Sequence, residues 1–409
     1  MVNVKTWVEI SESRLLANYK ALAEAAGPNT AILPVIKANA YGHNATLCAP
    51  ILARAGAPFL GVADADEGAA IREALTNIPQ PPQILVLCGT LPEGAPAIVH
   101  HQLTPVVWEQ HQLEPLAAAV RQHSGRPEPL PIHLEIDTGM ARQGIAPGEQ
   151  LHTLLHWLKR QPALRLDGVL THFASAEVAN APQTEIQRKR FEEALAEIVA
   201  ADLKPTWINA GSSSTLDNQC DNQPVAETLT WLAKLATSIG AKSIVRPGIA
   251  LYGYCLPIDH TQAETKPINQ PKVQPTLQPV LTWKTRILSL RNLAPGDAVG
   301  YNATYTAQQP MRIALLPVGY ADGLRRELSS TNTKPGGWVL IDGDKAPIVG
   351  RISMNLTTVD VTAIPRATPG DEVTVLGDRI TADDHAALAH TISYEILCGI
   401  RSPAHLKEN

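Results

Sequence analysis

The sequence predicts a two-domain α/β protein, in which an N-terminal (β/α)8 barrel is followed by a smaller C-terminal β-rich domain. Three observations support this prediction. Eight short apolar segments alternate with helical patterns up to residue 255, a proline-rich segment follows, and the remainder shows mostly the two-residue period of β-strands. The 409 residues are enough for a barrel of about 250 residues and a second domain.

The apolar segments are expected to be strands buried on both faces of a parallel sheet, because they are too apolar to face water. Between them lie helical patterns; in 11–26, Leu15, Tyr19 and Leu22 recur at three- and four-residue intervals and share one face. Eight such strands favour a closed barrel over an open doubly wound sheet. We expect strands at 31–37, 59–64, 83–88, 103–108, 131–137, 165–173, 206–211 and 242–253, and further helices near 66–76, 109–123, 184–201 and 225–239.

A change of composition defines the domains. We expect the barrel over 1–255 and a linker over 256–280, where prolines recur at four-residue intervals among polar residues. Residues 281–409 then form the β-domain, with one helix after a capping box that runs from Thr381 to Asp384.

Composition excludes several classes of function. A net charge of -5 and an aromatic content of 4% provide no surface for nucleic acid or an anionic membrane. The first residues lack the apolar stretch of a signal peptide, and no apolar run reaches the length of about 18 residues that spans a membrane. The five cysteines are scattered without a CxxC pair, as is typical of reduced thiols. We therefore expect a soluble cytoplasmic protein.

Polar side chains follow several predicted strands, at the end where barrel enzymes carry their active sites. Lys37 ends the first segment, Arg142 follows the fifth, His172 closes the sixth, a Gly/Ser loop at 209–214 follows the seventh, and Arg246 lies in the eighth. The histidines have no metal-ligand spacing, so we expect no metal. GxGxxG, GxxxxGK[ST] and GxSxG motifs are also absent from the sequence.

A lysine at a sheltered strand end can form a Schiff base, and a Gly/Ser loop can hold a phosphate. The residues themselves therefore favour pyridoxal phosphate, or alternatively a Schiff-base aldolase that acts on a phosphorylated substrate. Taken singly, each residue has a plainer explanation: Lys37 as a solvated strand end, His172 as a core histidine, and Arg246 as an ion-pair partner.

Eight segments, in order, resemble the alanine racemase family. They are VIKANAYGH, DTGMAR, THFAS, VRPGIALYG, VGYNATYTA, LPVGYADG, VGRISMN and SYEILCGI, between residues 35 and 400. The resemblance implies pyridoxal 5'-phosphate as cofactor, a strand at residues 1–10 that packs on the β-domain, and a head-to-tail homodimer with shared active sites. It also implies the interconversion of L- and D-alanine, which supplies D-alanine for peptidoglycan.

By this resemblance, Lys37 would hold the cofactor covalently and exchange the proton on the D-side of the substrate α-carbon. Tyr301 of the partner subunit would be the base on the L-side, since racemisation needs one base on each face. His172 and Arg246 match the positions that assist this tyrosine. Arg246 would also face the pyridine nitrogen and leave it unprotonated, which restrains transamination and decarboxylation.

The other family positions concern the substrate and the phosphate. Arg142 would contact the phenolic oxygen of the cofactor and the substrate carboxylate. Met354 of the partner subunit would offer its backbone N–H to that carboxylate, with Asn355 beside it and Tyr320 at the opening of the active site. The phosphate contacts would be Tyr41, Ser213, Gly248, Ile249 and Tyr394.

Three departures from the family pattern are predicted to matter. Glu135 stands where many members carry a carboxylated lysine, so we expect it to supply negative charge to Arg142 directly and to make activity insensitive to bicarbonate. Asn355 replaces an aspartate, which removes repulsion against a substrate carboxylate and loosens specificity. Asn209 replaces the histidine behind Arg246, which predicts a weaker or rearranged contact.

Residues 215–241 look expanded relative to the family, which predicts an extra helix of undefined role. A broad-specificity or serine racemase of the same fold remains an alternative. A barrel-fold amino-acid decarboxylase is less favoured, since those enzymes pair an acidic residue with the pyridine nitrogen. A non-catalytic pyridoxal-phosphate-binding protein is disfavoured by the β-domain.

Overall fold

In the computed structural model, the described residues are 5–123, 128–220, 226–261 and 269–407. The chain divides into two compact units: a barrel unit of residues 15–40 and 48–277, and a β-unit of residues 1–14, 41–47 and 278–409. The division at 277 falls within the segment 256–280 that is expected to be a linker. Residues 262–268 of that segment lie outside the described residues.

The barrel unit contains eight parallel strands in the spatial order β2-β10-β8-β7-β6-β5-β4-β3. A parallel bridge between Val35 and Gly61 brings the two ends of this sheet together, and Ile36 N donates to Gly61 O over 2.7 Å. The predicted barrel is thereby confirmed, with a strand in each of the eight apolar segments. These strands are β2 (Thr30–Ile32), β3 (Phe59–Val62), β4 (Gln83–Val86), β5 (Thr104–Val107), β6 (Leu130–Glu135), β7 (Leu164–Leu170), β8 (Trp207–Ser212) and β10 (Lys242–Arg246).

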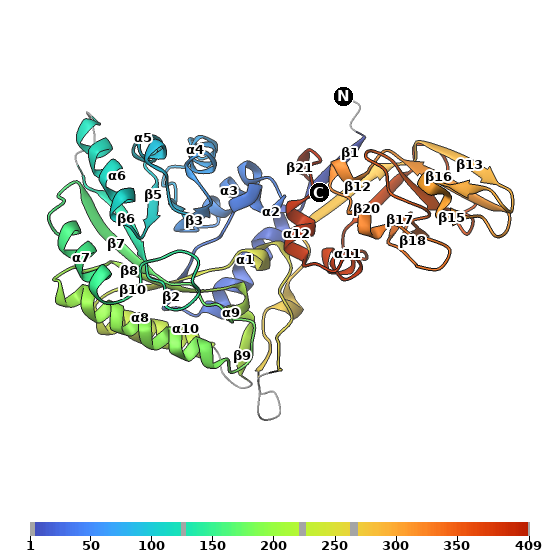
Figure 1. The fold of residues 1–409 in the computed structure, drawn as a ribbon. Coiled ribbons are helices and arrows are strands. Elements are labelled where there is room, and N and C mark those ends of the chain that lie inside the picture. The colour runs from blue at the N-terminus through green and yellow to red at the C-terminus, as the bar shows by residue number, and fades with distance from the viewer. Residues whose placement is uncertain (1–4, 124–127, 221–225, 262–268, 408–409) are drawn as a thin grey trace. The chain divides into compact units, whose positions relative to one another are not determined.

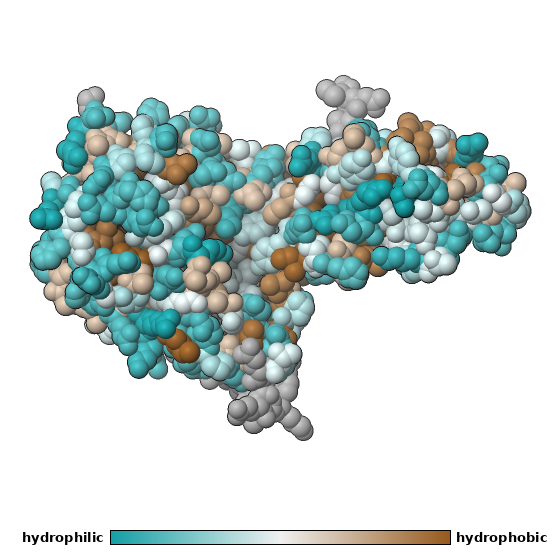
Figure 2. Space-filling model, viewed as in Figure 1, coloured by the Kyte–Doolittle hydropathy of each residue, from teal (hydrophilic) through white to brown (hydrophobic). Residues whose placement is uncertain are grey.

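Helices line the outside of this barrel (Figure 1). The outer face shown in Figure 2 is mostly hydrophilic, with small and separate hydrophobic patches, as is usual for a helix layer exposed to water. The predicted helices form α1 (Glu12–Ala26), α4 (Ala65–Ala74), α6 (Gln110–Gln122), α8 (Pro182–Ala200) and α10 (Glu227–Ser238).

Among the described residues of the barrel unit, three further helices of six or more residues were not predicted: α3 (Ala45–Arg54), α5 (Ala95–His100) and α7 (Glu149–Leu158). Proline explains one of these omissions, because Pro50 lies inside α3 and an interior proline usually breaks a helix. Helix α5 has only six residues, which is too short for a clear helical period. The third helix, α7, begins directly after Gly148, which adopts a positive φ of 104°.

The expanded segment 215–241 holds more than one extra element. It contains most of the short helix α9 (Ser213–Asp217), the strand β9 (Asn218–Cys220) and α10. Strand β9 pairs antiparallel with β11 (Asn269–Pro271), which belongs to the expected linker. Residues 221–225 of the expansion lie outside the described residues.

The β-unit is built on a six-stranded sheet in the order β18-β17-β20-β12-β1-β21, with a three-stranded sheet β13-β16-β19 and a short pair, β14 and β15. Strand β1 (Thr6–Ile10) pairs antiparallel with β12 (Leu281–Arg286), so residues 6–10 belong to the sheet of this unit. The other strands are β13 (Ser289–Leu293), β14 (Ala298–Val299), β15 (Tyr305–Thr306), β16 (Met311–Leu316), β17 (Trp338–Ile341), β18 (Asp344–Pro347), β19 (Thr357–Asp360), β20 (Glu372–Leu376) and β21 (Ala404–Leu406).

Two helices complete the described part of the β-unit, where one was expected: α11 (Ala382–Ala389), which was predicted, and the short α12 (Ser393–Cys398), which was not. The predicted capping box is confirmed, because Thr381 Oγ1 accepts a hydrogen bond from Asp384 N over 3.2 Å. Residues 352–362 have β periodicity, but only 357–360 form a strand. Along the parts of the chain that the structure describes, no helix combines the length and the apolar character that crossing a membrane requires.

Candidate active site

Lys37 begins a left-handed turn, α2 (Lys37–Tyr41), at the edge where the barrel closes. Ala38, Asn39 and Ala40 have φ values of 52°, 53° and 56°, in a region that costs L-residues about 1–2 kcal/mol each. Asn39 N donates to Glu67 Oε1 over 3.1 Å, and this contact holds the turn against the first turn of α4. Such strain persists where the surrounding structure imposes it, and it is concentrated at functional sites.

Arg246, at the end of β10, connects the end of β7 with the neighbouring strand β8. Its Nη2 donates to Thr171 O over 2.9 Å, and its Nη1 donates to Asn209 Oδ1 over 2.5 Å. Nη2 also lies 3.2 Å from Nδ1 of His172. Because a guanidinium has only donors, Nδ1 accepts this bond, and the neutral imidazole therefore carries its proton on Nε2.

The electrostatics of His172 show that three cations gather around it. Burial lowers the pKa of His172 to about 3, and the charges of Arg246, Arg142 and Lys37 act in the same direction. His172 is therefore a neutral imidazole at physiological pH, and the positive charge of the site belongs to the arginines and the lysine. Burial also lowers the pKa of Arg246 to about 10, so its guanidinium remains protonated near neutrality.

Asp137 organises the loop after β6 that presents Arg142. Its Oδ1 accepts hydrogen bonds from the backbone N–H groups of Gly139, Met140 and Ala141 over 2.9, 2.9 and 3.1 Å. Arg142 is the next residue of this loop, and it is exposed.

The carboxylate of Glu135 is bound by Gln143 rather than by Arg142. Gln143 Nε2 donates to Glu135 Oε2 and also to Leu87 O over 3.0 Å. Burial raises the pKa of Glu135, while the Gln143 bond and the charges of Arg246 and Arg142 oppose that increase. Among the described residues, Glu135 is therefore hydrogen-bonded by Gln143, the sequence neighbour of Arg142, instead of by Arg142 itself.

The expected phosphate contacts of the barrel unit lie together. Ser213, which begins α9, uses its Oγ to accept hydrogen bonds from Gly248 N over 3.0 Å and Ala250 N over 3.2 Å. Ile249 lies between these two residues and is fully buried. Since both acceptor positions of the Ser213 oxygen are used, its O–H remains to donate to an anion.

The other two expected phosphate contacts lie in the β-unit. The rings of Tyr41 and Tyr394 are 5.9 Å apart and tilted by 59°. Gly42 follows Tyr41 with a φ of 82°, and a Cβ atom at this position would lie 2.2 Å from Leu397 O. Only glycine allows this close approach between residue 42 and α12.

Tyr301 and Tyr320 line one pocket of about 790 Å³ in the β-unit, together with the guanidinium-bearing residues Arg325, Arg326 and Arg401. The side chains of Tyr301 and Tyr320 are 64% and 44% exposed, respectively.

Met354 and Asn355 lie in an exposed loop next to Tyr320. The backbone joins the two segments, since Ala321 N donates to Met354 O over 2.9 Å. The candidate site residues thus form two groups, one in each unit.

No sequence pattern indicated Gln187, whose side chain hydrogen-bonds the loops that follow β6 and β7. Gln187, on α8, is fully buried. Its Nε2 donates to Thr138 Oγ1 over 3.0 Å and to His172 O over 2.8 Å, and its Oε1 accepts from Ala174 N over 2.9 Å. A glutamine on an amphipathic helix is usually solvated, so no local pattern could have identified it.

Comparison with known proteins covers both units. The family model for the alanine racemase N-terminal domain matches residues 10–256, and that for the alanine racemase C-terminal domain matches residues 280–406. The alanine racemase of Syntrophobacter fumaroxidans is 36% identical to the chain over 400 residues, which cover 97% of this chain and 95% of that protein.

Solved structures agree with these matches. The alanine racemase of Streptomyces coelicolor superposes with a TM-score of 0.83 at 30% identity, covering 99% of this chain and 98% of that one. The alanine racemase of Bartonella henselae, solved with covalently bound pyridoxal phosphate, gives a TM-score of 0.77 at 25% identity, covering 98% and 99%.

Proposed function

The chain belongs to the alanine racemase family, whose members are isomerases of alanine, and we propose that it uses pyridoxal phosphate and two bases, Lys37 and Tyr301. The observation that carries this proposal is the cluster of Lys37, Arg142 and Arg246 around a neutral His172. The two bases would act on opposite faces of the α-carbon, because one removes the proton and the other returns it with inversion.

The barrel residues fit an anionic cofactor. Three cations act on His172, while the carboxylate of Glu135 is buried beside them, so the cluster carries excess positive charge that a phosphate or phenolate would balance. The O–H of Ser213 would donate to the phosphate, and Lys37 would bind the cofactor covalently. When bound, pyridoxal phosphate withdraws electrons from the α-carbon and makes its proton acidic.

Arg246 has a restraining role in this proposal. Its guanidinium is held by Asn209, Thr171 and His172 and has no proton to give near neutrality. A ring nitrogen that faced it would stay unprotonated, which makes the ring a weaker electron sink and suppresses transamination and decarboxylation. A barrel-fold decarboxylase needs an acidic residue at this point, so Arg246 disfavours that alternative.

We further propose that the active enzyme is a head-to-tail homodimer. In this assembly, Tyr301 of the partner subunit would supply the second base, and Met354 of the partner subunit would bind the substrate carboxylate through its N–H. The exposure of both side chains, 64% and 57%, supports this assignment because a neighbouring chain can reach them. The product would serve peptidoglycan synthesis in the cytoplasm.

Deuterium exchange with the holoenzyme in D₂O tests the two bases separately. The wild type should label the α-carbon of both enantiomers. Tyr301→Phe should stop racemisation and abolish exchange of L-alanine, while D-alanine continues to exchange through Lys37. Tyr305→Phe is the matched control, because Tyr305 is a neighbouring tyrosine without a proposed role.

Loss of Lys37 should remove both reactions. Lys37→Ala should also lose the absorbance of covalently bound cofactor near about 420 nm. Racemisation that persists in Tyr301→Phe would exclude Tyr301 as a base. If the wild type shows the absorbance of bound cofactor but exchanges no α-proton of alanine, the cofactor site is supported and alanine is not the substrate.

A further inference from the structure

The turn that carries Tyr320 packs directly on the backbone of Ser353 and Met354. Tyr320 N donates to Ser353 O over 3.1 Å, and Ala321 N donates to Met354 O over 2.9 Å. A Cβ atom on Gly319 would lie 2.3 Å from Ser353 O and 2.4 Å from Met354 O, so only glycine fits. The backbone positions of Tyr320 and Met354 are therefore fixed together.

One carboxylate closes this turn. Asp322 Oδ2 accepts a hydrogen bond from Gly319 N over 3.0 Å, and Asp322 N donates back to Gly319 O over 3.0 Å. The carbonyl oxygen of Asp322 accepts from Arg401 N over 3.0 Å. Next to it, a Cβ atom on Gly323 would lie 2.4 Å from Gly399 O. Asp322 thus fixes the turn on its inner side and links it to the segment after α12.

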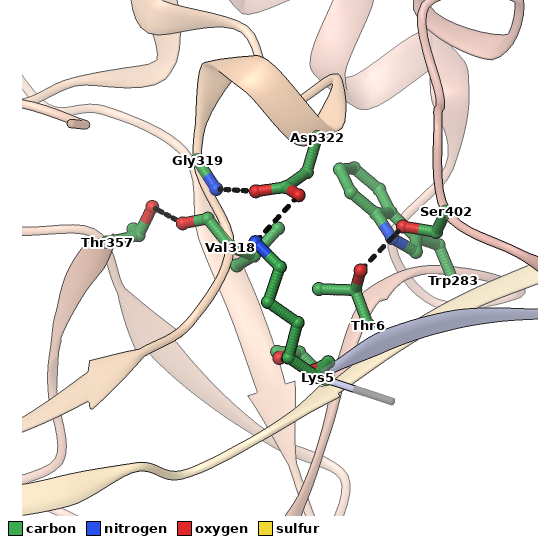
Figure 3. A network of polar contacts seen from close by, with 9 residues as sticks. Lys5, Thr6, Trp283, Val318, Gly319, Asp322, Thr357 and Ser402 are labelled. Carbon is green, nitrogen blue, oxygen red and sulfur yellow. Dashed lines mark hydrogen bonds and ion pairs between the residues drawn. The ribbon is translucent and has the colours of Figure 1, made fainter. Parts of the chain in front are cut away.

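Lys5, directly before β1, holds the other oxygen of the same carboxylate (Figure 3). Its Nζ lies 3.0 Å from Asp322 Oδ1, and the two side chains are 47% and 14% exposed, respectively. The start of β1 is itself fixed, because Lys5 O accepts from Thr285 Oγ1 over 2.8 Å and Thr6 Oγ1 accepts from Ser402 Oγ over 2.8 Å. Lys5 is therefore a fixed anchor for the carboxylate.

We propose that Asp322 is a positioning residue for substrate binding and that Lys5 holds it in place. This inference rests on the proposed function, in which the backbone N–H of Met354 binds the substrate carboxylate in the active site shared with the partner subunit. The ion pair fixes the Asp322 carboxylate, the carboxylate fixes Gly319, and Gly319 fixes the backbone of Met354. Loss of the pair should weaken the hold on the substrate carboxylate and leave the proton transfers intact.

Steady-state kinetics of the holoenzyme with L-alanine test this proposal. Lys5→Ala should raise KM about three- to tenfold with kcat within about twofold, as expected when binding is lost equally from the ground and transition states. Asp322→Asn keeps an acceptor for Gly319 N but loses the ion pair, so it should match Lys5→Ala. The double variant should be no worse than either single variant, because both remove one interaction.

Three further measurements separate positioning from a general loss of structure. Lys5→Arg should restore KM. Propionate, which has the carboxylate and methyl group of alanine without its amine, should inhibit Lys5→Ala more weakly, in proportion to KM. Arg366→Ala is the control, because it removes the exposed ion pairs of Arg366 with Asp342 and Asp344 in the same unit, and it should leave KM unchanged.

Two results would overturn the positioning role of Asp322. If Lys5→Ala and Asp322→Asn keep the wild-type KM, or lose kcat alone, Asp322 does not position the substrate site. If the double variant is additive, the two residues act separately and the proposal is also overturned. A wild type that does not racemise alanine would reject the proposed function, which is a separate result from a wild type that racemises while its variants are unchanged.

Discussion

Arg246 Nη1, at the end of β10, donates a 2.5 Å hydrogen bond to Oδ1 of Asn209, which lies within the adjacent strand β8. Asn209 is fully buried, and within the described ranges its Nδ2 has no hydrogen-bond partner. The amide is therefore oriented by the arginine alone. The contact predicted from the sequence to be weaker or rearranged is a short, charge-assisted bond in the structure.

Asn209→Ala should lower kcat for alanine about tenfold, because a hydrogen bond to a charged group contributes about 1.5–3 kcal/mol and its loss frees the guanidinium. Asn209→His, which restores the family residue, should retain most of kcat. Gln83→Ala is the control: Gln83 bonds Thr104 Oγ1 over 2.8 Å at the opposite end of the barrel, so it should lower Tm and spare kcat. Equal kcat in Asn209→Ala and wild type would show that Arg246 needs no such support.

We expect activity to be independent of bicarbonate, because the buried carboxylate belongs to the glutamate side chain of Glu135 and does not have to be formed from CO₂. Enzyme stripped of CO₂ should keep full kcat, and added bicarbonate should have no effect. Glu135→Lys should be inactive when stripped and should regain activity with bicarbonate, because a carboxylated lysine restores a negative charge near Gln143. Bicarbonate rescue of the stripped wild type would contradict this account.

The eight barrel strands were predictable from the sequence because parallel strands buried on both faces are continuous apolar runs. The packing of a barrel requires that burial. The turn after Lys37 was not predictable. Ala38 and Ala40 favour right-handed helix, yet both have positive φ, and contacts distant in sequence such as Glu67 impose this conformation. Local propensity cannot report a strain that tertiary contacts maintain.

Local sequence also does not determine which side chains make contact in the candidate site. The sequence could identify four site residues because each lies at or after the end of a strand at the same end of the barrel: Lys37, Arg142, His172 and Arg246. Gln143 takes the contact expected for Arg142, which is itself exposed in the loop held by Asp137. One residue along a loop thus decides which side chain reaches the carboxylate, and no periodicity encodes that choice.

Asn355 predicts that the enzyme accepts substrates other than alanine, which is the second candidate function. The exposed loop Ser353–Met354–Asn355 lacks the carboxylate that would repel a substrate carboxylate. L-Serine should therefore be racemised at a measurable kcat/KM, and Asn355→Asp should raise the alanine-to-serine ratio of kcat/KM several-fold. Turnover of alanine alone by the wild type would reject the prediction, and Ser353→Cys is a control that leaves the charge unchanged.

Buried histidines should make the protein less stable in mild acid. His133, in β6, is fully buried beside Gly168, and burial lowers its pKa to about 4, with Asp167 opposing the change. The unfolded chain binds a proton below about pH 6.5, whereas the folded chain does so only near pH 4, so stability falls as pH decreases through this window.

At pH 5.5 the loss from His133 should be on the order of 1 kcal/mol relative to pH 8. Urea unfolding at the two pH values should therefore show a smaller difference for His133→Leu than for the wild type. His385, in α11, is also buried with its pKa lowered to about 4, so His385→Leu should give a similar reduction in the other unit. If the double variant loses stability between pH 8 and 5.5 as steeply as the wild type, the acid sensitivity arises from other groups.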